Sequence, residues 1–429
     1  MAGRRVRRPR RVGVLRRNPN FRRLFLADTV SNIGTEVSFL AISLLAVLNL
    51  DATPLELGVL QASSSLAFLL VGLPAGAWVD RLPKRPMLLA TDLGRFVLFL
   101  TIPVASALGI LTLVQLIVVV GIAGVGTVLF DVAHYAYLPA VVERADLTEA
   151  NGRFAATHTV AQVAGPGLAG TVVKLLGAPV AVLADALSYL VSFGWVLRIS
   201  SPEPERAAAE QRNLVREVRE GLSFLLGTPT LRRIAISTAG FNFVGSIEMA
   251  ITVLFLARTL GLGAGVIGLM FTITGIGGVI GALVASRVVG RYGIAFGIRV
   301  LPMLTTPFCL LIPLSQRGWT LSLFCVGFGT LGFGIAIFNV SQNSYRQAAV
   351  PAPLLGRVSA SLRFISWGSM PIGGLVGGAL ADGIGIRNTL WIACVGWVLD
   401  VLLLLRINAS DIEDAFSQPP VKEQPSPSP

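Results

Sequence analysis

The sequence predicts an all-α membrane protein with twelve transmembrane helices arranged as two pseudo-symmetric six-helix bundles. Three observations support this fold class: the composition, the recurrence of long apolar segments, and an internal repeat. Of the 429 residues, 53% are hydrophobic and only 14% are charged, and the mean hydropathy is +0.73. A soluble protein of this length needs more charge to cover its surface. The 46 glycines agree with a membrane protein, because small residues let membrane helices approach closely.

Apolar segments of about twenty residues, the length that spans a bilayer core of about 30 Å, recur along the whole chain. They predict spans at residues 24–49, 55–79, 86–108, 111–137, 155–177, 179–199, 231–257, 264–289, 294–314, 319–345, 357–381 and 387–406. The division that follows is a basic cytosolic tail (1–23), an N-terminal bundle (24–199), a linker (200–230), a C-terminal bundle (231–406) and a disordered cytosolic tail (407–429). We also expect a charged loop at 138–154, and an amphipathic helix on the membrane surface within the linker, where Leu214, Val218, Leu222 and Leu225 recur at helical spacing.

The net charge of +12 is distributed as in a membrane protein rather than a nucleic-acid-binding one. Ten arginines lie in residues 1–23, and most of the other basic residues lie in short loops. This pattern indicates membrane topology and contact with anionic lipids, so we expect no nucleic-acid partner. Of 35 Lys and Arg residues, only Lys174, Arg258, Arg317 and Arg387 fall in or beside the opposite set of loops. The positive-inside rule therefore predicts a multi-pass protein of the cell membrane with both termini in the cytosol.

An internal repeat relates the two halves. Residues 18–23 match residues 228–233 at an offset of 210, and at this offset Gly58 meets Gly268 and Arg81 meets Arg291. Residues 151–154 resemble residues 355–358 at an offset of 204. In transporters built from such parallel repeats the substrate site lies between the halves, near mid-membrane.

The loop after the second span carries the first resemblance to a known family. Its sequence, Gly76-Ala77-Trp78-Val79-Asp80-Arg81-Leu82-Pro83-Lys84-Arg85, resembles the loop between helices 2 and 3 of the major facilitator superfamily, which usually has Gly where this chain has Pro83. The resemblance implies the major facilitator fold. It also implies a gating charge network that holds the cytosolic side shut, with Gly76, Asp80, Arg81, Arg85 and Asp131 as its members.

Span 5 carries the second resemblance. Residues 161–170 resemble the G-x-x-x-G-P-x-x-G-G stretch associated with antiporters, with Ala161 and Ala169 in place of two glycines. Gly165, Pro166 and Gly170 would form an antiporter-like kink, because proline removes a backbone hydrogen bond. With the segments 131–133 and 137–140, the chain is most similar to the bacterial branch that contains macrolide efflux and enterobactin export proteins. Drug exporters of the family often carry an Arg in span 4, and residues 111–137 contain none.

Ionisable residues deep in spans are the candidates for proton coupling, because charge in lipid is costly and is tolerated chiefly where it functions or is paired. Glu36 and Glu248 lie inside spans 1 and 7, and a carboxyl group in an apolar cavity can exchange a proton near neutral pH. Alternatively, each is a structural hydrogen-bonding group between helices. Asp92 and Arg95 can pair on one helix face, and Asp185 and Asp400 are interpreted as residues that pair with or cap a neighbouring helix. The candidate cavity residues are His158, Gln162, Phe241, Asn242, Phe271, Asn339, Gln342 and Trp367.

These features predict a monomeric secondary transporter, a proton-coupled exporter of drug-like or antibiotic-like molecules that works by alternating access. The chain has no phosphate-binding GxxxxGK[ST] motif and no cluster of residues with metal-ligand spacing, so we expect no enzyme, cofactor or metal site. The expected partners are a small-molecule substrate, protons and anionic lipids. A siderophore exporter of the enterobactin-export type, an importer or uniporter, and a non-transporting membrane sensor or scaffold stay open as alternatives.

Overall fold

The structure, a computed structural model, describes residues 13–201 and 214–417. This part of the chain is helical and contains no strand. Eleven of its helices are long and apolar enough to cross a membrane, and the shorter apolar segment Phe296–Leu311 lies where the ninth span is predicted. The first half contains α1 (Val14–Arg17), α2 (Pro19–Leu48), α3 (Pro54–Arg81), α4 (Lys84–Ala107), α5 (Leu113–Val141), the 3-10 turn η1 (Arg144–Asp146), α6 (Leu147–Leu176) and α7 (Ala178–Leu197).

The second half follows the helix α8 (Leu214–Gly227) of the linker. It contains α9 (Pro229–Leu254), η2 (Phe255–Thr259), α10 (Ala264–Tyr292), η3 (Phe296–Val300), α11 (Leu301–Thr305), η4 (Thr306–Leu311), α12 (Leu321–Ala349), α13 (Ala352–Gly368), α14 (Met370–Ile384), α15 (Ile386–Leu405) and α16 (Ala409–Ser417). The all-helical membrane architecture predicted from the sequence is therefore confirmed.

Two spans are interrupted where the sequence analysis expects regular helices. The ninth passes from a π turn (η3) through α11 to a 3-10 turn (η4), and it contains Pro302 and Pro307. The eleventh is divided into α13 and α14 at Ser369, next to Pro371. Proline cannot donate the helical backbone hydrogen bond and clashes with the preceding turn, which accounts for both interruptions.

Two predicted loops are partly helical. The predicted loop 138–154 shortens to residues 142–146, because α5 continues to Val141 and α6 begins at Leu147. The tail predicted to be disordered over 407–429 contains α16, whose Ile412 is buried against the C-terminal half, while residues 418–429 lie outside the described residues. In both places the hydrophobicity signal ends with the membrane, whereas helical structure extends beyond it, as a continuation of α5 and α6 in the first case and as the separate helix α16 in the second.

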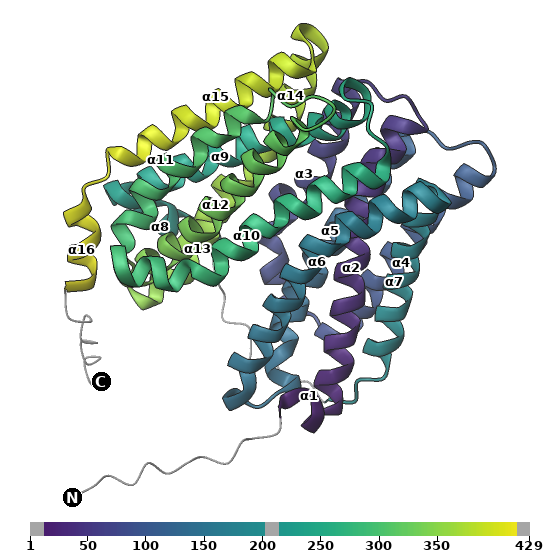
Figure 1. The fold of residues 1–429 in the computed structure, drawn as a ribbon. Coiled ribbons are helices and arrows are strands. Elements are labelled where there is room, and N and C mark those ends of the chain that lie inside the picture. The colour runs from purple at the N-terminus through teal and green to yellow at the C-terminus, as the bar shows by residue number, and fades with distance from the viewer. Residues whose placement is uncertain (1–12, 202–213, 418–429) are drawn as a thin grey trace, which may run out of the picture.

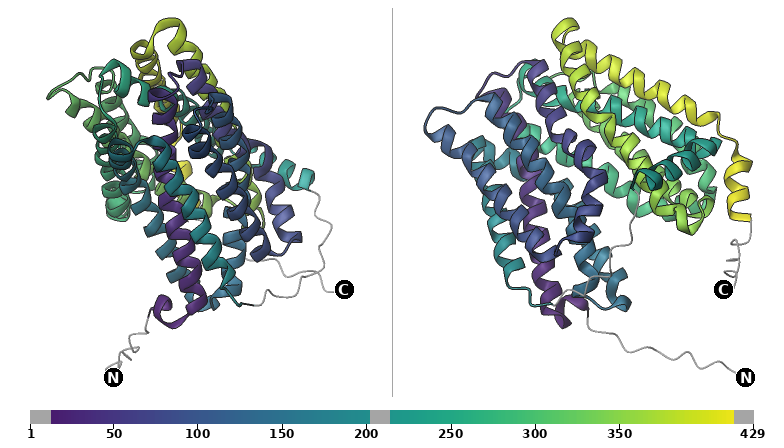
Figure 2. Two further views of the ribbon diagram at one scale, coloured as in Figure 1. Left: turned by 90° about the vertical axis from the view of Figure 1, so that its right-hand side faces the viewer. Right: turned by 180° about the vertical axis from the view of Figure 1, so that it is seen from behind.

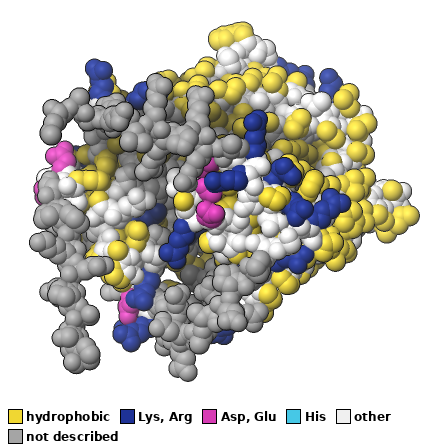
Figure 3. Space-filling model, turned by 90° about the horizontal axis from the view of Figure 1, so that it is seen from below, with side chains coloured by type: hydrophobic (Ala, Val, Ile, Leu, Met, Phe, Trp, Pro, Cys, Tyr) yellow, Lys and Arg dark blue, Asp and Glu magenta, His cyan; other side chains and the backbone are white. Residues whose placement is uncertain are grey.

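The two halves form separate bundles that meet at the end of the molecule opposite the chain termini and diverge toward the termini (Figure 1, Figure 2). Arg258 of the second half reaches Val47 and Asp51 of the first at the closed end, with its Nη2 3.3 Å from the Val47 carbonyl oxygen. Lys and Arg side chains are spread over the face that carries the termini (Figure 3). Exposed examples at helix ends are Arg22, Arg81, Arg198, Arg232 and Arg291.

Glycines make the two helix crossings that hold the halves together. At the α6–α10 crossing a Cβ on Gly268 would lie 2.8 Å from the Cα of Gly170, so a side chain there has no room. At the α3–α14 crossing a Cβ on Gly58 would lie 3.0 Å from the Cα of Gly378, and Gly374 packs against the same turn. The repeat offsets relate Gly58 to Gly268 and Gly170 to Gly374, so the two crossings are pseudo-symmetric copies.

The linker helix α8 packs on α13. Gly221 lies against the backbone of Arg357, and Glu220 pairs with both Arg357 and Arg216 of its own helix. The hydrogen bond from Arg216 holds the pKa of Glu220 below its ordinary value. The predicted amphipathic helix is therefore present and docks on the C-terminal bundle, and its contact with a membrane surface stays a prediction.

Candidate functional site

A cavity of about 650 Å³, here called the central cavity, lies between the two halves. Helices α2, α3, α4, α5 and α7 line it from the first half, and α9, α13 and α14 line it from the second. Its aromatic lining is Phe39, Phe68, Phe99, Tyr189, Phe241 and Trp367, and its neutral polar lining includes Thr35, Ser38, Gln61, Ser64, Ser65, Thr127, Asn242 and Ser246. The predicted cavity residues Phe241, Asn242 and Trp367 are thus brought together.

Aromatic contacts fix the shape of the central cavity. Phe68 and Trp367 pack edge to face with ring centroids 4.8 Å apart, which joins α3 to α13 across the interface between the halves. Asn242 donates a hydrogen bond to the carbonyl oxygen of Ser366 (3.1 Å), close to the break between α13 and α14. The interruption of the eleventh span therefore exposes backbone polar groups that a cavity residue satisfies.

Asp185 of α7 is a cavity residue that the sequence analysis leaves aside. Its side chain is fully buried, and Ser188 donates to its Oδ1 at 3.0 Å. Its Oδ2 has no hydrogen-bond partner among the described residues. Thr35 and Tyr189, whose hydroxyl oxygens are 3.1 Å apart, lie in the same part of the cavity. An unpartnered buried carboxylate oxygen is costly, so this end of the cavity favours a cation, a proton or a hydrogen-bond donor.

A second cavity of about 390 Å³, here called the glutamate cavity, adjoins the first and shares Phe39, Phe241 and Met249 with it. Both predicted coupling residues, Glu36 and Glu248, line it. Other predicted site residues in its lining are Gln162, Pro166 and Phe271. The structure therefore places two carboxyl groups from opposite halves around one space.

The two glutamates differ in their surroundings. Glu36 is half-buried and makes no hydrogen bond or ion pair with the described residues. Gly165 of α6 packs directly against the Cβ of Glu36, so the antiporter-like stretch 161–170 contacts this candidate for proton coupling. Glu248 is buried and accepts a hydrogen bond from Thr252, one turn away on α9. Glu36 is thus the more accessible of the two carboxyl groups.

The antiporter-like residues lie at the interface between the halves. Pro166 lies inside a continuous α6, its carbonyl oxygen faces Gly268, and Gly170 packs against the same turn of α10. The small residues therefore permit the close α6–α10 crossing, and the predicted kink stays a prediction.

A charged cluster lies in the N-terminal half, toward the end with the termini. Arg95 pairs with Asp92 at 2.6 Å, as the sequence spacing predicts, and its guanidinium lies 4.3 Å from the ring centroid of Tyr189. His134 approaches Asp28 at 3.8 Å. Asp131 is exposed and within electrostatic range of Asp28, His134 and Arg95.

The structure describes the surroundings of only some of the proposed gating residues. Arg85 donates to the carbonyl oxygen of Leu197 at 2.7 Å, which ties the loop to the end of α7 within the same half. Arg81 is exposed, and a Cβ on Gly76 would meet nothing within 4 Å. The side chain of Asp80 lies outside the described residues. Because the halves diverge at this end, the gating role stays a prediction for the opposite conformation.

Three other predicted cavity residues lie elsewhere. Gln342 donates to Asn339 at 2.7 Å, and both lie within the C-terminal half, away from the two cavities between the halves. His158 is exposed on α6, one turn before Gln162, and lines neither cavity. Among the described residues, no group of three or more His, Cys, Asp or Glu side chains could hold a metal ion.

Sequence reasoning missed the polar side of α3. The run Gln61-Ala62-Ser63-Ser64-Ser65 interrupts an apolar span, and Gln61, Ser64 and Ser65 all face the central cavity. A cluster of hydroxyl and amide groups within one membrane helix is a signal that could have identified this lining.

Comparison with known proteins supports the assignment to a transporter family. The sequence profile of the family described as transmembrane secretion effector matches residues 15–428. The multidrug efflux pump Tap of Mycolicibacterium fortuitum is 27% identical over 389 residues, covering 87% of this chain and 92% of that protein. Macrolide efflux protein A of Streptococcus pyogenes is 23% identical over 349 residues, covering 77% of this chain and 82% of that protein.

Solved structures agree on the fold. A bacterial homologue of the iron transporter ferroportin in an inward-facing state has a TM-score of 0.71 at 13% identity, covering 92% of this chain and 99% of that one. The match to the family profile extends over nearly the whole chain, and the family and the structural neighbours are transporters rather than enzymes. The chain therefore belongs to the transmembrane secretion effector family, within the major facilitator superfamily, and is a multi-pass membrane transporter related to drug and macrolide efflux proteins.

Proposed function

We propose that this transporter is a proton-coupled exporter of bulky amphipathic molecules of the drug or antibiotic kind. The observation that carries the proposal is the pair of adjoining cavities between the halves, one lined by aromatic and hydroxyl groups and the other by Glu36 and Glu248. A site at the interface between two rocking halves is reached from one side at a time, which is the requirement of alternating access. With the termini in the cytosol, the present conformation opens toward the cytosol.

The lining of the central cavity favours an amphipathic substrate. Six aromatic side chains together with Met249 and Met370 form adaptable apolar walls, and the polar anchors are few and mostly neutral. The names of the two efflux relatives, one for multiple drugs and one for macrolides, point the same way.

The rival reading as a siderophore exporter fits less well. A catecholate siderophore is anionic and should require cationic side chains in its site. No Lys, Arg or His is among the described residues that line either cavity, whereas Asp185, Glu36 and Glu248 contribute three carboxyl groups. Charge complementarity therefore supports a neutral or cationic substrate.

Glu36 is the preferred proton carrier. It lines the glutamate cavity without a partner among the described residues, so protonation breaks no existing contact. Glu36 also packs on Gly165 next to the α6–α10 crossing, so a change in the charge of Glu36 affects the packing between the halves. In the proposed cycle, a proton enters from outside as the substrate leaves, and the Asp80–Arg81 loop with Asp131 holds the cytosolic side shut in the outward-open state. The working unit is a monomer whose basic face contacts anionic lipid.

The test is transport in proteoliposomes with an imposed proton gradient, with a macrolide or a fluorescent cationic dye as substrate. Wild type, Glu36→Gln and Glu248→Gln are compared, with Glu143→Gln as a control in an exposed loop residue. We expect gradient-driven efflux in wild type and in the control, and loss of coupling with retained binding in Glu36→Gln. Full coupling in both glutamine variants would exclude these carriers. An acidic exterior that drives uptake would identify an importer, and no movement of any substrate would support the sensor or scaffold alternative.

A further inference from the structure

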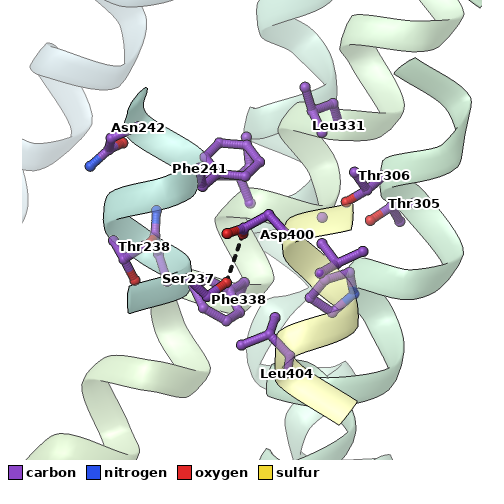
Figure 4. Close-up of a pocket in the computed structure, with 15 residues that line it drawn as sticks. Ser237, Thr238, Phe241, Asn242, Thr305, Thr306, Leu331, Phe338, Asp400 and Leu404 are labelled. Atoms are coloured by element: carbon purple, nitrogen blue, oxygen red, sulfur yellow. Dashed lines mark hydrogen bonds between the residues drawn. The ribbon is translucent and has the colours of Figure 1, made fainter. Parts of the chain in front are cut away.

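A third cavity is lined only by residues of the C-terminal half, and it shares Phe241 with both cavities between the halves. The pocket has a volume of about 110 Å³. Asp400 of α15 lies among the residues that line it (Figure 4). The other oxygen-bearing side chains that line it come from α9, α11, η4 and α12: Ser237, Thr238, Asn242, Thr305, Thr306 and Asn339. The pocket is too small for a drug-sized molecule but has room for an ion with water.

Asp400 is the only carboxyl group among the described residues that line the pocket, and no Lys, Arg or His lines it. The residue is 9% exposed, and Ser237 donates to its Oδ2 at 2.8 Å. Its Oδ1 has no hydrogen-bond partner in the described part of the chain. Gly240 packs against this oxygen, and a Cβ there would lie 3.3 Å from the Asp400 Cγ. A carboxylate held this way inside a membrane protein requires a counter-charge or a proton.

The internal repeat shows what fills the corresponding place in the N-terminal half. Helices α7 and α15 have equal length and start after glycines with φ of +88°, Gly177 and Gly385, which sets an offset of 208. At this offset Asp400 corresponds to Ser192, which donates to Asp92 at 2.7 Å. Asp92 is neutralised by Arg95. A serine–aspartate bond to this helix is therefore present in both halves, but it joins α7 to α4 in the first half and α15 to α9, the counterpart of α2, in the second.

The cation of that cluster has no counterpart in the second half. Arg95 lies 4.4 Å from the ring centroid of Phe130, and α5 and α12, which are also equal in length, relate Phe130 to Phe338, a residue that lines the pocket. At the loop offset of 210, Arg95 corresponds to Thr305, which also lines the pocket. Where the first half contains a guanidinium group, the second half contains a threonine and a cavity.

We propose that this pocket binds a small, hard monovalent cation, of which sodium is the natural probe. Asp400 is its charged ligand, and hydroxyl and amide oxygens from α9, η4 and α12 are its neutral ligands. An all-oxygen donor set suits hard cations rather than transition metals, and a single carboxylate neutralises one charge. A carboxyl group that only carried a proton would need one acceptor, not a cavity surrounded by further polar side chains.

A bound cation would connect α9, α15 and the irregular ninth span. Thr305 and Thr306 lie where α11 changes to η4, so their hydroxyl groups reach the pocket from a backbone that is not regularly helical. The cation would therefore stabilise the C-terminal half, whatever molecule the transporter carries. The inference stands independently of the proposed export function.

The test is the thermal stability of the purified full-length protein at constant pH and ionic strength. Choline chloride is replaced stepwise by NaCl, and separately by KCl and LiCl. A ligand that binds only the folded state raises the midpoint of unfolding in a saturable manner. We expect such a rise for at least one of these ions in wild type and its loss in Asp400→Asn. The control is Glu143→Gln, which removes a carboxylate at an exposed loop position outside the three cavities and should keep the full response.

A second variant keeps the proposal testable if Asp400→Asn does not fold. Thr306→Val removes one neutral oxygen with little change of shape, and it should raise the half-saturating salt concentration severalfold while the carboxylate is intact. The proposal is overturned if none of the three ions gives a saturable response in wild type. It is also overturned if Asp400→Asn keeps that response. A third contrary outcome is that the unfolding midpoint of wild type depends on the protonation of Asp400 but on none of the ions. That last outcome would identify a proton site.

Discussion

Gly268 lies where α10 crosses α6, and replacing it with valine should shift the balance between the two transport conformations. A Cβ at this position would be 2.8 Å from the Cα and 3.0 Å from the backbone nitrogen of Gly170. Both contacts are with backbone, so no flexible side chain can move aside. Since this crossing closes the end opposite the termini, the added side chain opposes the conformation described here and favours the one in which the crossing separates.

The size of the effect follows from the cost of overpacking, which is about 1–3 kcal/mol for added methyl groups in a well-packed contact. A bias of about 1–3 kcal/mol changes the ratio of two states by about 5- to 150-fold. The matched control is Gly290→Val, on the same helix, where a Cβ would meet nothing within 4 Å. Both variants replace a glycine of α10 by valine, so a difference between their conformational ratios reports the effect of the crossing.

The assay is a distance measurement between spin labels on cysteines at Gly152 and Gly356, pseudo-equivalent exposed positions near the ends that diverge. Cys325 is replaced by serine so that it does not take up the spin label. The other two native cysteines stay in place because they are buried. We expect long distances in wild type and Gly290→Val, and a population at shorter distance in Gly268→Val. Identical distance distributions in the two variants would refute the reasoning that this crossing separates during transport.

Three further predictions concern buried charge and the linker. Arg95→Met should lower stability by about 3–5 kcal/mol, because it leaves Asp92 buried without its partner. The thermal midpoint measures this loss, and a double variant with Asp92→Asn that is no more stable than Arg95→Met would contradict it. Asp185→Asn should weaken binding of tetraphenylphosphonium by about 10- to 150-fold, from a charged contact of about 1.5–3 kcal/mol, and leave binding of uncharged chloramphenicol unchanged. Equal losses in equilibrium binding would show that Asp185 only supports the fold. Glu220 has a pKa below its ordinary value of 4.5, chiefly through Arg216, so its contribution to docking of α8 is present above that value and is lost as the pH falls through the lowered pKa. Hydrogen exchange in α8 should therefore rise only in acid, and Glu220→Gln should raise it already at pH 7, whereas unchanged protection in that variant would disprove the link.

The span count illustrates how far sequence reasoning reaches. Hydrophobic length predicts where the chain crosses the membrane. It does not predict the irregular ninth span, which contains Pro302 and Pro307, or the break of the eleventh span at Ser369. These interruptions depend on whether neighbouring groups satisfy the backbone hydrogen bonds that proline frees. Asn242 does so near Ser369 from a helix that is 124 residues distant in sequence.

The candidate site shows the same division between what the sequence predicts and what only the tertiary structure decides. Glu36 and Glu248 are identifiable from the sequence because ionisable residues are rare in apolar spans, and the structure places both in one cavity. Asp185 and Asp400 carry the same signal, yet one faces a cavity between the halves and the other a pocket within one half. Gln342, selected as a polar residue inside a span, lies away from both cavities between the halves.

The sequence by itself determined the membrane class, the approximate spans, the two-half repeat and the family, because these follow from hydrophobic length, charge distribution and local motifs. The tertiary structure decided which helices cross, which polar groups share a cavity, and which half carries an arginine where the other carries a pocket. The physical reason is that a helix in a bilayer can rotate and pair without changing its hydrophobicity pattern. Only close packing, such as the contact of Gly170 with Gly268, fixes the direction in which each side chain points.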